Sequence, residues 1–192
     1  SDLSRLLLDG VTYSVTSFKD SGAGSLRDAI EQANASPGAD TISFAKGGTI
    51  KLLSALPAIT DDLAITAAKK VTIDGAGKSS IFSVTGQGTD ATFAGLTLTR
   101  GFSEEGGAAF LIDAADGVVE ISRAAMTKMI SSGQDVRGGA ISILHGNVTL
   151  KDSSISASAA TSVEGTAYGG AIFSADTLTV SGSKITKNTA TA

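Results

Sequence analysis

Cysteine and tryptophan are absent from the 192-residue chain, and proline and histidine are scarce, with two and one residues respectively. The absence of cysteine excludes a disulfide framework, a thiolate metal site and a cysteine nucleophile. No stretch approaches the roughly 20 consecutive apolar residues of a membrane-spanning helix, so we expect no direct membrane insertion. The 15 basic and 19 acidic residues give a net charge of -4, which repels nucleic acid in bulk, so we expect no nucleic-acid partner.

Small and β-branched residues dominate what is present. The 25 serines and 21 threonines together outnumber the 34 charged residues, and the chain also holds 23 glycines. This composition favours many short strands joined by tight turns. We therefore expect a β protein.

One segment, residues 25–35, has the pattern of a helix. Ser25 followed by Asp28 forms a capping box, and Pro37 disfavours helical backbone at the residue before it. Residues 11–18 alternate in the manner of a strand. The apolar residues of the predicted helix recur on one face: Leu26, Ala29, Ile30 and Ala33.

Internal repetition distinguishes among the β architectures. A Gly-Gly-Ala sequence opens residues 106–109, 138–141 and 169–172, at spacings of 32 and 31 residues. Apolar residues then recur once per repeat in three columns, whose members are Ala91, Val119, Val148 and Leu178; Phe93, Ile121, Leu150 and Val180; and Leu98, Met126, Ile155 and Ile185. Equivalent apolar positions about 30 residues apart predict a β-solenoid, in which each coil stacks about 4.8 Å from the last.

We expect residues 1–44 to form an N-terminal cap, made of a strand and helix 25–35, and residues 45–192 to form the coils. The apolar run at residues 6–8 should pack on this domain. Because residues 185–192 end in mid-repeat, we expect either that the coils continue in a longer protein or that the last coil associates end to end with another chain.

Residues 20–30, DSGAGSLRDAI, and residues 37–44 resemble the N-terminal segment of large bacterial surface proteins with right-handed parallel β-helix repeats. A related group carries Cys-Ser-Leu-Arg-Glu-Ala where residues 24–29 read Gly-Ser-Leu-Arg-Asp-Ala. The Gly-Gly-Ala-Ile repeats are similar to those of chlamydial polymorphic outer-membrane proteins, and residues 185–188 occupy the place of their Phe-x-x-Asn sequence. The resemblance implies an exported bacterial protein, extracellular or on the cell surface, with an adhesin-like passenger role.

Parallel β-helices also include polysaccharide lyases and hydrolases, which place carboxylates in one groove. Asp61, Asp62 and His145 are the suggestive residues, but they lie nearly three coils apart, or roughly 14 Å. No Asp or Glu recurs in register across the coils. We therefore expect no catalytic residue, cofactor or metal site, and we expect His145 to be a surface turn residue. The alternative is an enzyme whose catalytic coils lie outside this chain.

The loop before each Gly-Gly lengthens from coil to coil. It spans 8 residues from Leu98 to Gly106, 12 from Met126 to Gly138 and 14 from Ile155 to Gly169. Insertions at one corner stack into a ridge, where solenoids commonly bind their ligands, although tolerated insertion without function is the alternative. We expect a structural or adhesive segment that contacts a glycan or a surface protein through this ridge: Phe102, Glu104, Glu105, Asp135, Arg137, Glu164 and Tyr168.

Overall fold

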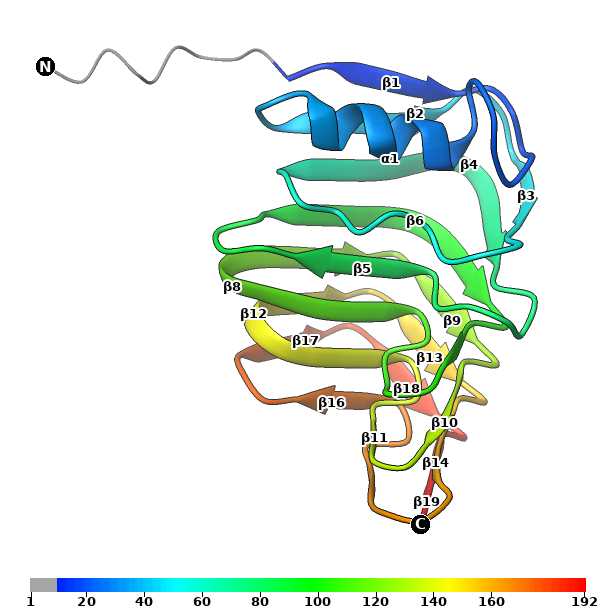
Figure 1. Ribbon diagram of the computed structural model, residues 1–192, viewed down its shortest axis with the longest axis vertical. Helices are drawn as coiled ribbons and strands as arrows, with labels where there is room; N and C mark the ends of the chain where they lie inside the picture. Colours follow the sequence, from blue (N-terminus) through cyan, green and yellow to red (C-terminus); the bar gives the residue numbers. More distant parts are fainter. Residues whose placement is uncertain (1–9) are drawn as a thin grey trace, which may run out of the picture.

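Strands of successive coils lie side by side and parallel along most of the chain (Figure 1). This computed structural model describes residues 10–192, so the expected packing of residues 6–8 falls outside the described part. The all-β parallel β-helix predicted from the sequence is confirmed. The main path of paired strands runs through β1 (Thr12–Val15), β2 (Asp40–Phe44), β4 (Leu63–Asp74), β6 (Ala91–Thr99), β8 (Phe110–Ser122), β12 (Ile141–Lys151) and β16 (Ile172–Ser174).

The three predicted apolar columns are confirmed residue by residue. In the second column, Phe93 pairs with Ile121, Ile121 with Leu150, and Leu150 with Val180. The same column continues toward the N-terminus through Ile65, and beyond it through Ile42 and Tyr13. Stacking therefore runs through residue 44 without a break at the expected start of the coils.

Shorter strands complete the coils. They are β3 (Gly48–Lys51), β5 (Phe82–Thr85), β9 (Ala125–Thr127), β13 (Ser154–Ser156), β17 (Leu178–Ser181) and β18 (Lys184–Thr186). In the third column, Met126 of β9 pairs with Leu98 on one side and Ile155 on the other, as predicted. Val180 and Ile185, the final members of their columns, have exposed fractions of 44% and 43%. The end-to-end association expected at this coil stays a prediction, to be tested by sedimentation.

The chain bends between strands at single residues in the left-handed backbone region. One such column of equivalent residues is Gly95, Arg123, Asp152 and Gly182, with φ from 48° to 75°, and a second is Arg100, Lys128, Ala157 and Lys187, with φ from 51° to 57°. A single left-handed residue turns a strand sharply without a loop. We call these the first and second corner columns.

The three Gly-Gly sequences lie at equivalent places in successive coils, but the predicted alignment of the first one is shifted by one residue. Phe110 pairs with Ile141, which pairs with Ile172, so Gly107, Gly138 and Gly169 are the equivalent glycines. Their spacing is 31 and 31 residues, and the predicted first interval of 32 is wrong. All three have a positive φ, between 66° and 77°.

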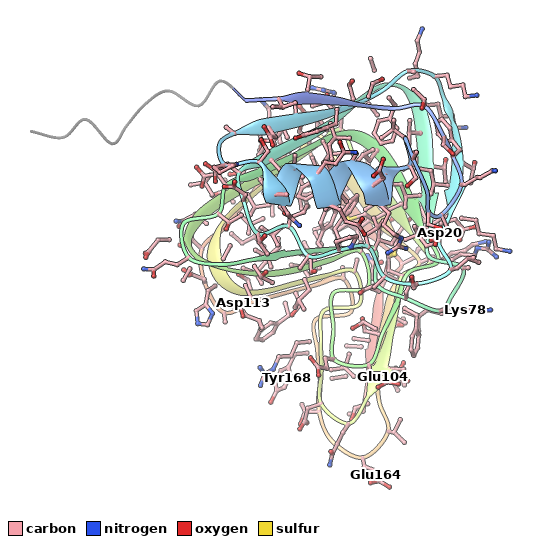
Figure 2. The ribbon with its side chains drawn as sticks, turned by 45° about the horizontal axis from the view of Figure 1, so that its top comes forward. Asp20, Lys78, Glu104, Asp113, Glu164 and Tyr168 are labelled. Atoms are coloured by element: carbon pink, nitrogen blue, oxygen red, sulfur yellow. The ribbon has the colours of Figure 1, made fainter. Side chains whose placement is uncertain are left out.

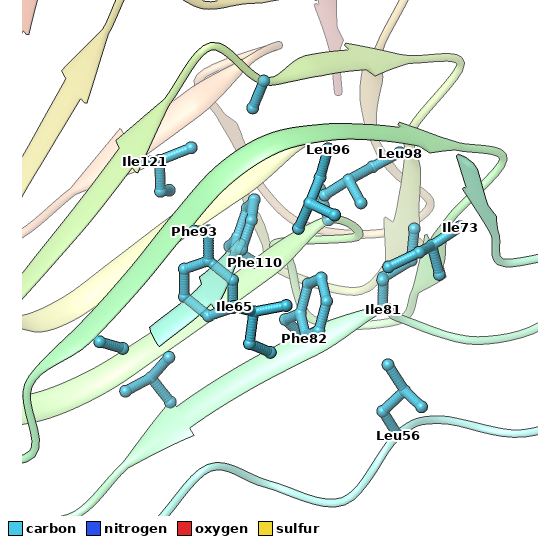
Figure 3. Packing of buried hydrophobic residues seen from close by; sticks show 14 of the residues in the cluster. Leu56, Ile65, Ile73, Ile81, Phe82, Phe93, Leu96, Leu98, Phe110 and Ile121 are labelled. Carbon is cyan, nitrogen blue, oxygen red and sulfur yellow. The ribbon is translucent and has the colours of Figure 1, made fainter. Parts of the chain in front are cut away.

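The inside of the coils is filled with aliphatic side chains around a group of three phenylalanines (Figure 3). The ring centroids of Phe93 and Phe82 are 4.9 Å apart, those of Phe93 and Phe110 are 4.8 Å apart, and those of Phe82 and Phe110 are 5.5 Å apart. All three side chains are at most 1% exposed. Stacked and edge-on rings at such distances stabilise a core beyond the area they bury.

Helix α1 (Leu26–Ala35) covers the N-terminal end of the stack, where it contacts β1 and β2 (Figure 1). Ser25 caps it as predicted, because its Oγ accepts a hydrogen bond from the Asp28 amide at 3.2 Å. The Asp28 carboxylate accepts from the amide of Gly24 at 2.8 Å instead of from that of Ser25. No helix in residues 10–192 is both long enough and apolar enough to cross a membrane. The predicted apolar face is the buried face: Leu26, Ala29, Ile30 and Ala33.

At the other end, Asn188 ties the last coil to the one before it. Its side chain accepts a hydrogen bond from the Ser158 amide at 2.9 Å and donates one to the Ile155 carbonyl at 3.1 Å. Met129 occupies the corresponding place two coils earlier, where its sulfur lies 3.3 Å from the Gly101 amide. The asparagine of the Phe-x-x-Asn-like sequence therefore has a structural role in joining coils.

An ion pair between the buried Asp74 carboxylate and the half-exposed Arg100 guanidinium fixes one position on the second corner column. Nε of Arg100 donates to Oδ1 of Asp74 at 2.9 Å, and its Nη2 bonds to Oδ2. The Arg100 hydrogen bond lowers the pKa of Asp74 below its ordinary 3.8, against the opposing effect of burial, and the Ala76 amide adds to the lowering. The carboxylate form of Asp74 therefore stabilises the folded state.

This pair predicts a pH-dependent stability. A carboxyl group with a lowered pKa stabilises the fold above its unfolded pKa of 3.8, and this stabilisation is lost as the pH falls through the lower folded-state value. Asp74→Asn should therefore unfold more easily than the unmodified chain near neutral pH, and the gap should shrink below about pH 4. Urea unfolding at a series of pH values measures the gap. A gap that stays constant down to about pH 2 would mean that the ionisation of Asp74 does not contribute.

Candidate functional site

A ridge projects from one side of the coils (Figure 2). It is built from stacked short strands in two small parallel sheets, and Glu164 lies at its tip. The ridge predicted from the loop lengths is therefore present. Its strands are β7 (Phe102–Ser103), β10 (Ile130–Gly133), β14 (Ala159–Ser162) and β19 (Thr189–Thr191) in one sheet, and β11 (Val136–Arg137) and β15 (Ala167–Tyr168) in the other.

Hydrogen bonds between coils hold the ridge loops in fixed positions. The Arg137 amide donates to the Glu105 carbonyl at 2.8 Å, and Arg137 is the strand partner of Tyr168. The Asp135 carboxylate accepts from the Thr166 amide at 2.9 Å. Glu105, Arg137 and Tyr168 thus follow one another on three successive coils, and their backbone positions are fixed before a ligand binds.

A first hollow, of about 430 Å³, lies on the N-terminal side of the ridge. Glu104, Glu105 and Phe102 line it from the ridge, and the 78–80 loop and Leu111 line it from the body. Lys78 brings a positive charge to the same hollow as the two carboxylates. The hollow therefore contains both negatively and positively charged side chains, and the Phe102 ring lines one of its sides.

A second hollow, of about 180 Å³, lies in the angle between the ridge and the outer face of the main sheet. Its wall is formed by Glu105, Asp135 and Arg137, and its floor includes Leu111 and the 142–144 segment. Glu105 and Leu111 line both hollows, so the two are neighbouring parts of one groove. We call the two hollows together the ridge groove.

An aromatic pair extends the groove toward the C-terminal coils. The rings of Tyr168 and Phe173 are 6.1 Å apart, and the Arg137 guanidinium lies 5.6 Å from the centre of the Phe173 ring. Phe173 pairs with Ser142, which pairs with Leu111, so these three residues form one outward-facing row across three coils. Arg137 therefore connects the second hollow to the aromatic pair.

Six of the seven predicted ridge residues belong to this groove or its aromatic extension. The exception is Glu164, which lies at the tip, away from both hollows (Figure 2). Leu111, Phe173 and Lys78 were not predicted as site residues. Strand alternation could have identified Phe173 and Leu111. Each follows an inward-facing apolar residue in its strand, so its own side chain points outward.

His145 lies within strand β12, and the predicted turn at this residue is wrong. The register of β12 against β8 shifts on either side of His145, and this irregularity explains the turn-like sequence. Its Nδ1 is 2.7 Å from Oδ1 of Asp113, and both side chains are largely exposed. Nearby, hydrogen bonds from the Gly146 and Thr177 amides lower the pKa of Asp176.

Asp61 and Asp62 are used in backbone hydrogen bonds. Asp61 accepts from the Gly38 amide at 3.2 Å, and Asp62 accepts from the Asp90 amide at 2.8 Å. The pairing of Leu63 leads through three strand steps to the coil of His145, so the structure does not bring these acids to the histidine. Because Leu63 pairs with Ala91, Asp62 and Asp90 are equivalent residues of adjacent coils, and the expectation that no Asp or Glu recurs in register is wrong at this position.

Within residues 10–192, no group of three or more His, Cys, Asp or Glu side chains is arranged to hold a metal ion. No known protein-family model matches the chain, and a search of curated proteins finds no matching sequence.

Proposed function

We propose that the chain is a structural and adhesive segment of an exported bacterial surface protein, and that it binds a glycan in the ridge groove. The observation that carries this proposal is the alignment of Tyr168, Phe173 and Arg137 beside the carboxylates of Glu105 and Asp135. The bacterial origin and the export rest on the resemblance of residues 20–44.

A sugar has groups that can bind to aromatic rings, carboxylates and a guanidinium at the same time. A pyranose ring has C–H groups on its face and hydroxyls at its edge, so it packs on an aromatic ring while polar groups bind its hydroxyls. Tyr168 is 47% exposed and therefore accessible as such a surface. Carboxylate and guanidinium groups form the stronger, charge-assisted hydrogen bonds with those hydroxyls.

The parallel stack supports an adhesive role because it is rigid. Each coil is held to its neighbours by continuous strand pairing, so the ridge loops keep their spacing without a ligand. A preorganised surface loses less entropy on binding.

A glycan array, with every hit rechecked for released product by mass spectrometry, tests the proposal. We expect binding without product, and we expect Arg137→Gln and Tyr168→Ala each to weaken it about tenfold, a loss of about 1.4 kcal/mol. Glu164→Gln is the control, because this residue is at the tip, and it should bind like the unmodified chain.

Two results would contradict the proposal. Released product would show an enzyme of the polysaccharide-acting class, and the adhesive role would be wrong. Binding that is unchanged in both groove variants would place the ligand elsewhere on the coils.

A further inference from the structure

Outside the ridge, exposed basic side chains gather along the bends that enter and leave strands β9, β13 and β18. We call this group the basic corner: Arg123, Lys128, Lys151, Lys184 and Lys187. The ridge groove uses none of these residues.

The register of the coils sets the spacing of these charges. Lys128 and Lys187 belong to the second corner column and lie two coils apart, which corresponds to about 10 Å. Arg123 lies in the first corner column, and Lys184 begins β18, two coils further on. The cations therefore form a band along the axis of the stack instead of a single cluster.

These cations are not neutralised within the protein. The ion pairs among residues 10–192 join Arg27 to Asp20, Arg100 to Asp74 and His145 to Asp113, and none includes a residue of the basic corner. Asp152 is the exposed acid between these cations in the first corner column. The band thus has a net positive charge on a chain whose total charge is -4.

The backbone at these positions adds a second observation. Arg123, Lys128 and Lys187 have φ between 49° and 57°, a conformation that glycine adopts without strain and other residues adopt at a cost. Gly95 and Gly182 occupy the first corner column on other coils, so glycine fits there. Arg123 is therefore a long cationic side chain in a column where glycine fits, whereas Lys128 and Lys187 share their column with Arg100 and Ala157, at φ of 51° and 53°.

A shallow trough of about 410 Å³ runs over four coils at this corner. Arg123, Lys184 and Asp152 supply its charged groups, and Thr97 and Ser154 supply hydroxyls. None of its lining residues is aromatic. Single-stranded nucleic acids are usually bound by aromatic stacking, so the lining favours a polymer rich in hydroxyls and negative charges.

We propose that the basic corner binds an anionic polysaccharide, a sugar chain bearing carboxylate or sulfate groups, laid along the axis of the stack. The cations pair with the acidic groups of successive sugars, and the serine and threonine hydroxyls bind the sugar hydroxyls. This site is separate from the ridge groove and does not depend on ligand binding there.

Retention of the 192-residue chain on immobilised heparin, and its binding to polygalacturonate at several salt concentrations, test the proposal. Neutral dextran and a single-stranded oligothymidylate serve as comparison ligands. We expect salt-sensitive binding to both anionic polysaccharides and none to dextran. Lys128→Glu with Lys187→Glu should weaken binding at least about tenfold, whereas Lys19→Glu with Lys46→Glu, the same charge change near the N-terminal end of the stack, should change it less than about threefold.

Lys184→Glu provides a second variant away from the strained backbone positions, and thermal unfolding verifies that each variant is folded. Equal losses in the two double variants would assign the binding to overall charge and overturn the proposal. Absence of binding to either anionic polysaccharide would do the same. Tighter binding to oligothymidylate than to the polysaccharides would assign the corner to nucleic acid instead.

Discussion

Gly138→Ala should lower the free energy of unfolding by about 3 kcal/mol, from a left-handed backbone cost of about 1–2 kcal/mol and an overpacking cost of about 1–3 kcal/mol. Gly138 has a φ of 77°, and a Cβ at this residue would lie 1.9 Å from the carbonyl oxygen of Ile141 and 2.9 Å from the amide nitrogen of Phe173. Phe173 belongs to the next coil. The substitution therefore strains the backbone at this corner and also pushes against the backbone of the neighbouring coil.

Gly77→Ala is the matched control for this prediction. Gly77 has a φ of 69°, close to that of Gly138, but a Cβ there would meet no heavy atom within 4 Å. It should carry the backbone cost alone, about 1 kcal/mol. Urea unfolding followed by circular dichroism measures both variants, and equal losses would show that the coils move apart without resistance at the Gly-Gly corner.

The coils from residue 91 onward could be predicted from the sequence because equivalent positions of successive coils carry the same type of residue. A residue such as Ile121 lies inside, and its partners one coil away lie inside at the same place, so each column keeps one chemical character. Phe93 and Leu150 are such partners. The single-residue corners keep the interval between columns nearly constant, and the repeat therefore survives in the sequence.

The earlier coils were less readable because their corner is longer. Between Thr66 and Val71 of β4, the register against β6 shifts, and residues 67–70 occupy the place that Gly95 fills alone one coil later. This insertion interrupts the spacing of the columns. In the structure, the residues on both sides of this insertion belong to one bent strand, Leu63–Asp74.

The one-residue error at the first Gly-Gly has a local cause. Gly106 and Gly107 are both glycines, and the loop before them differs in length from the later ones, so the spacing alone does not decide which is equivalent to Gly138. The pairing of Phe110 with Ile141 decides it.

The sequence predicted the residues that the ridge loops contribute to the candidate site, but not the residues that the main sheet contributes. Loop length predicts a ridge, which led to Arg137 and Tyr168. Phe173 faces outward from a strand, and an outward residue becomes part of a groove only when a neighbouring loop covers one side of it. That relation depends on which coil the loop stacks against, and this information is in the pairing register and not in the spacing.

Phe93→Ala should be the other strongly destabilising change, with an expected loss of about 3–5 kcal/mol in the free energy of unfolding. The Phe93 ring lies within 5 Å, centre to centre, of both Phe82 and Phe110. Phe82 and Phe110 are strand partners on adjacent coils, so the removed ring leaves a cavity that faces both coils. Because strand pairing holds their backbones in place, the coils cannot close around this cavity, and most of its cost remains.

Phe102→Ala removes the same ring from the half-buried ridge strand β7 and is the control, with an expected loss of less than about 1.5 kcal/mol. Phe93→Leu should recover about half of the loss at the core position, because leucine refills part of the volume. Urea unfolding of the three variants measures these differences. A loss at Phe93 no larger than that at Phe102 would mean that the coils rearrange around the missing ring. In that case the strand pairing between coils, and not the side chains inside them, would supply most of the stability of the stack.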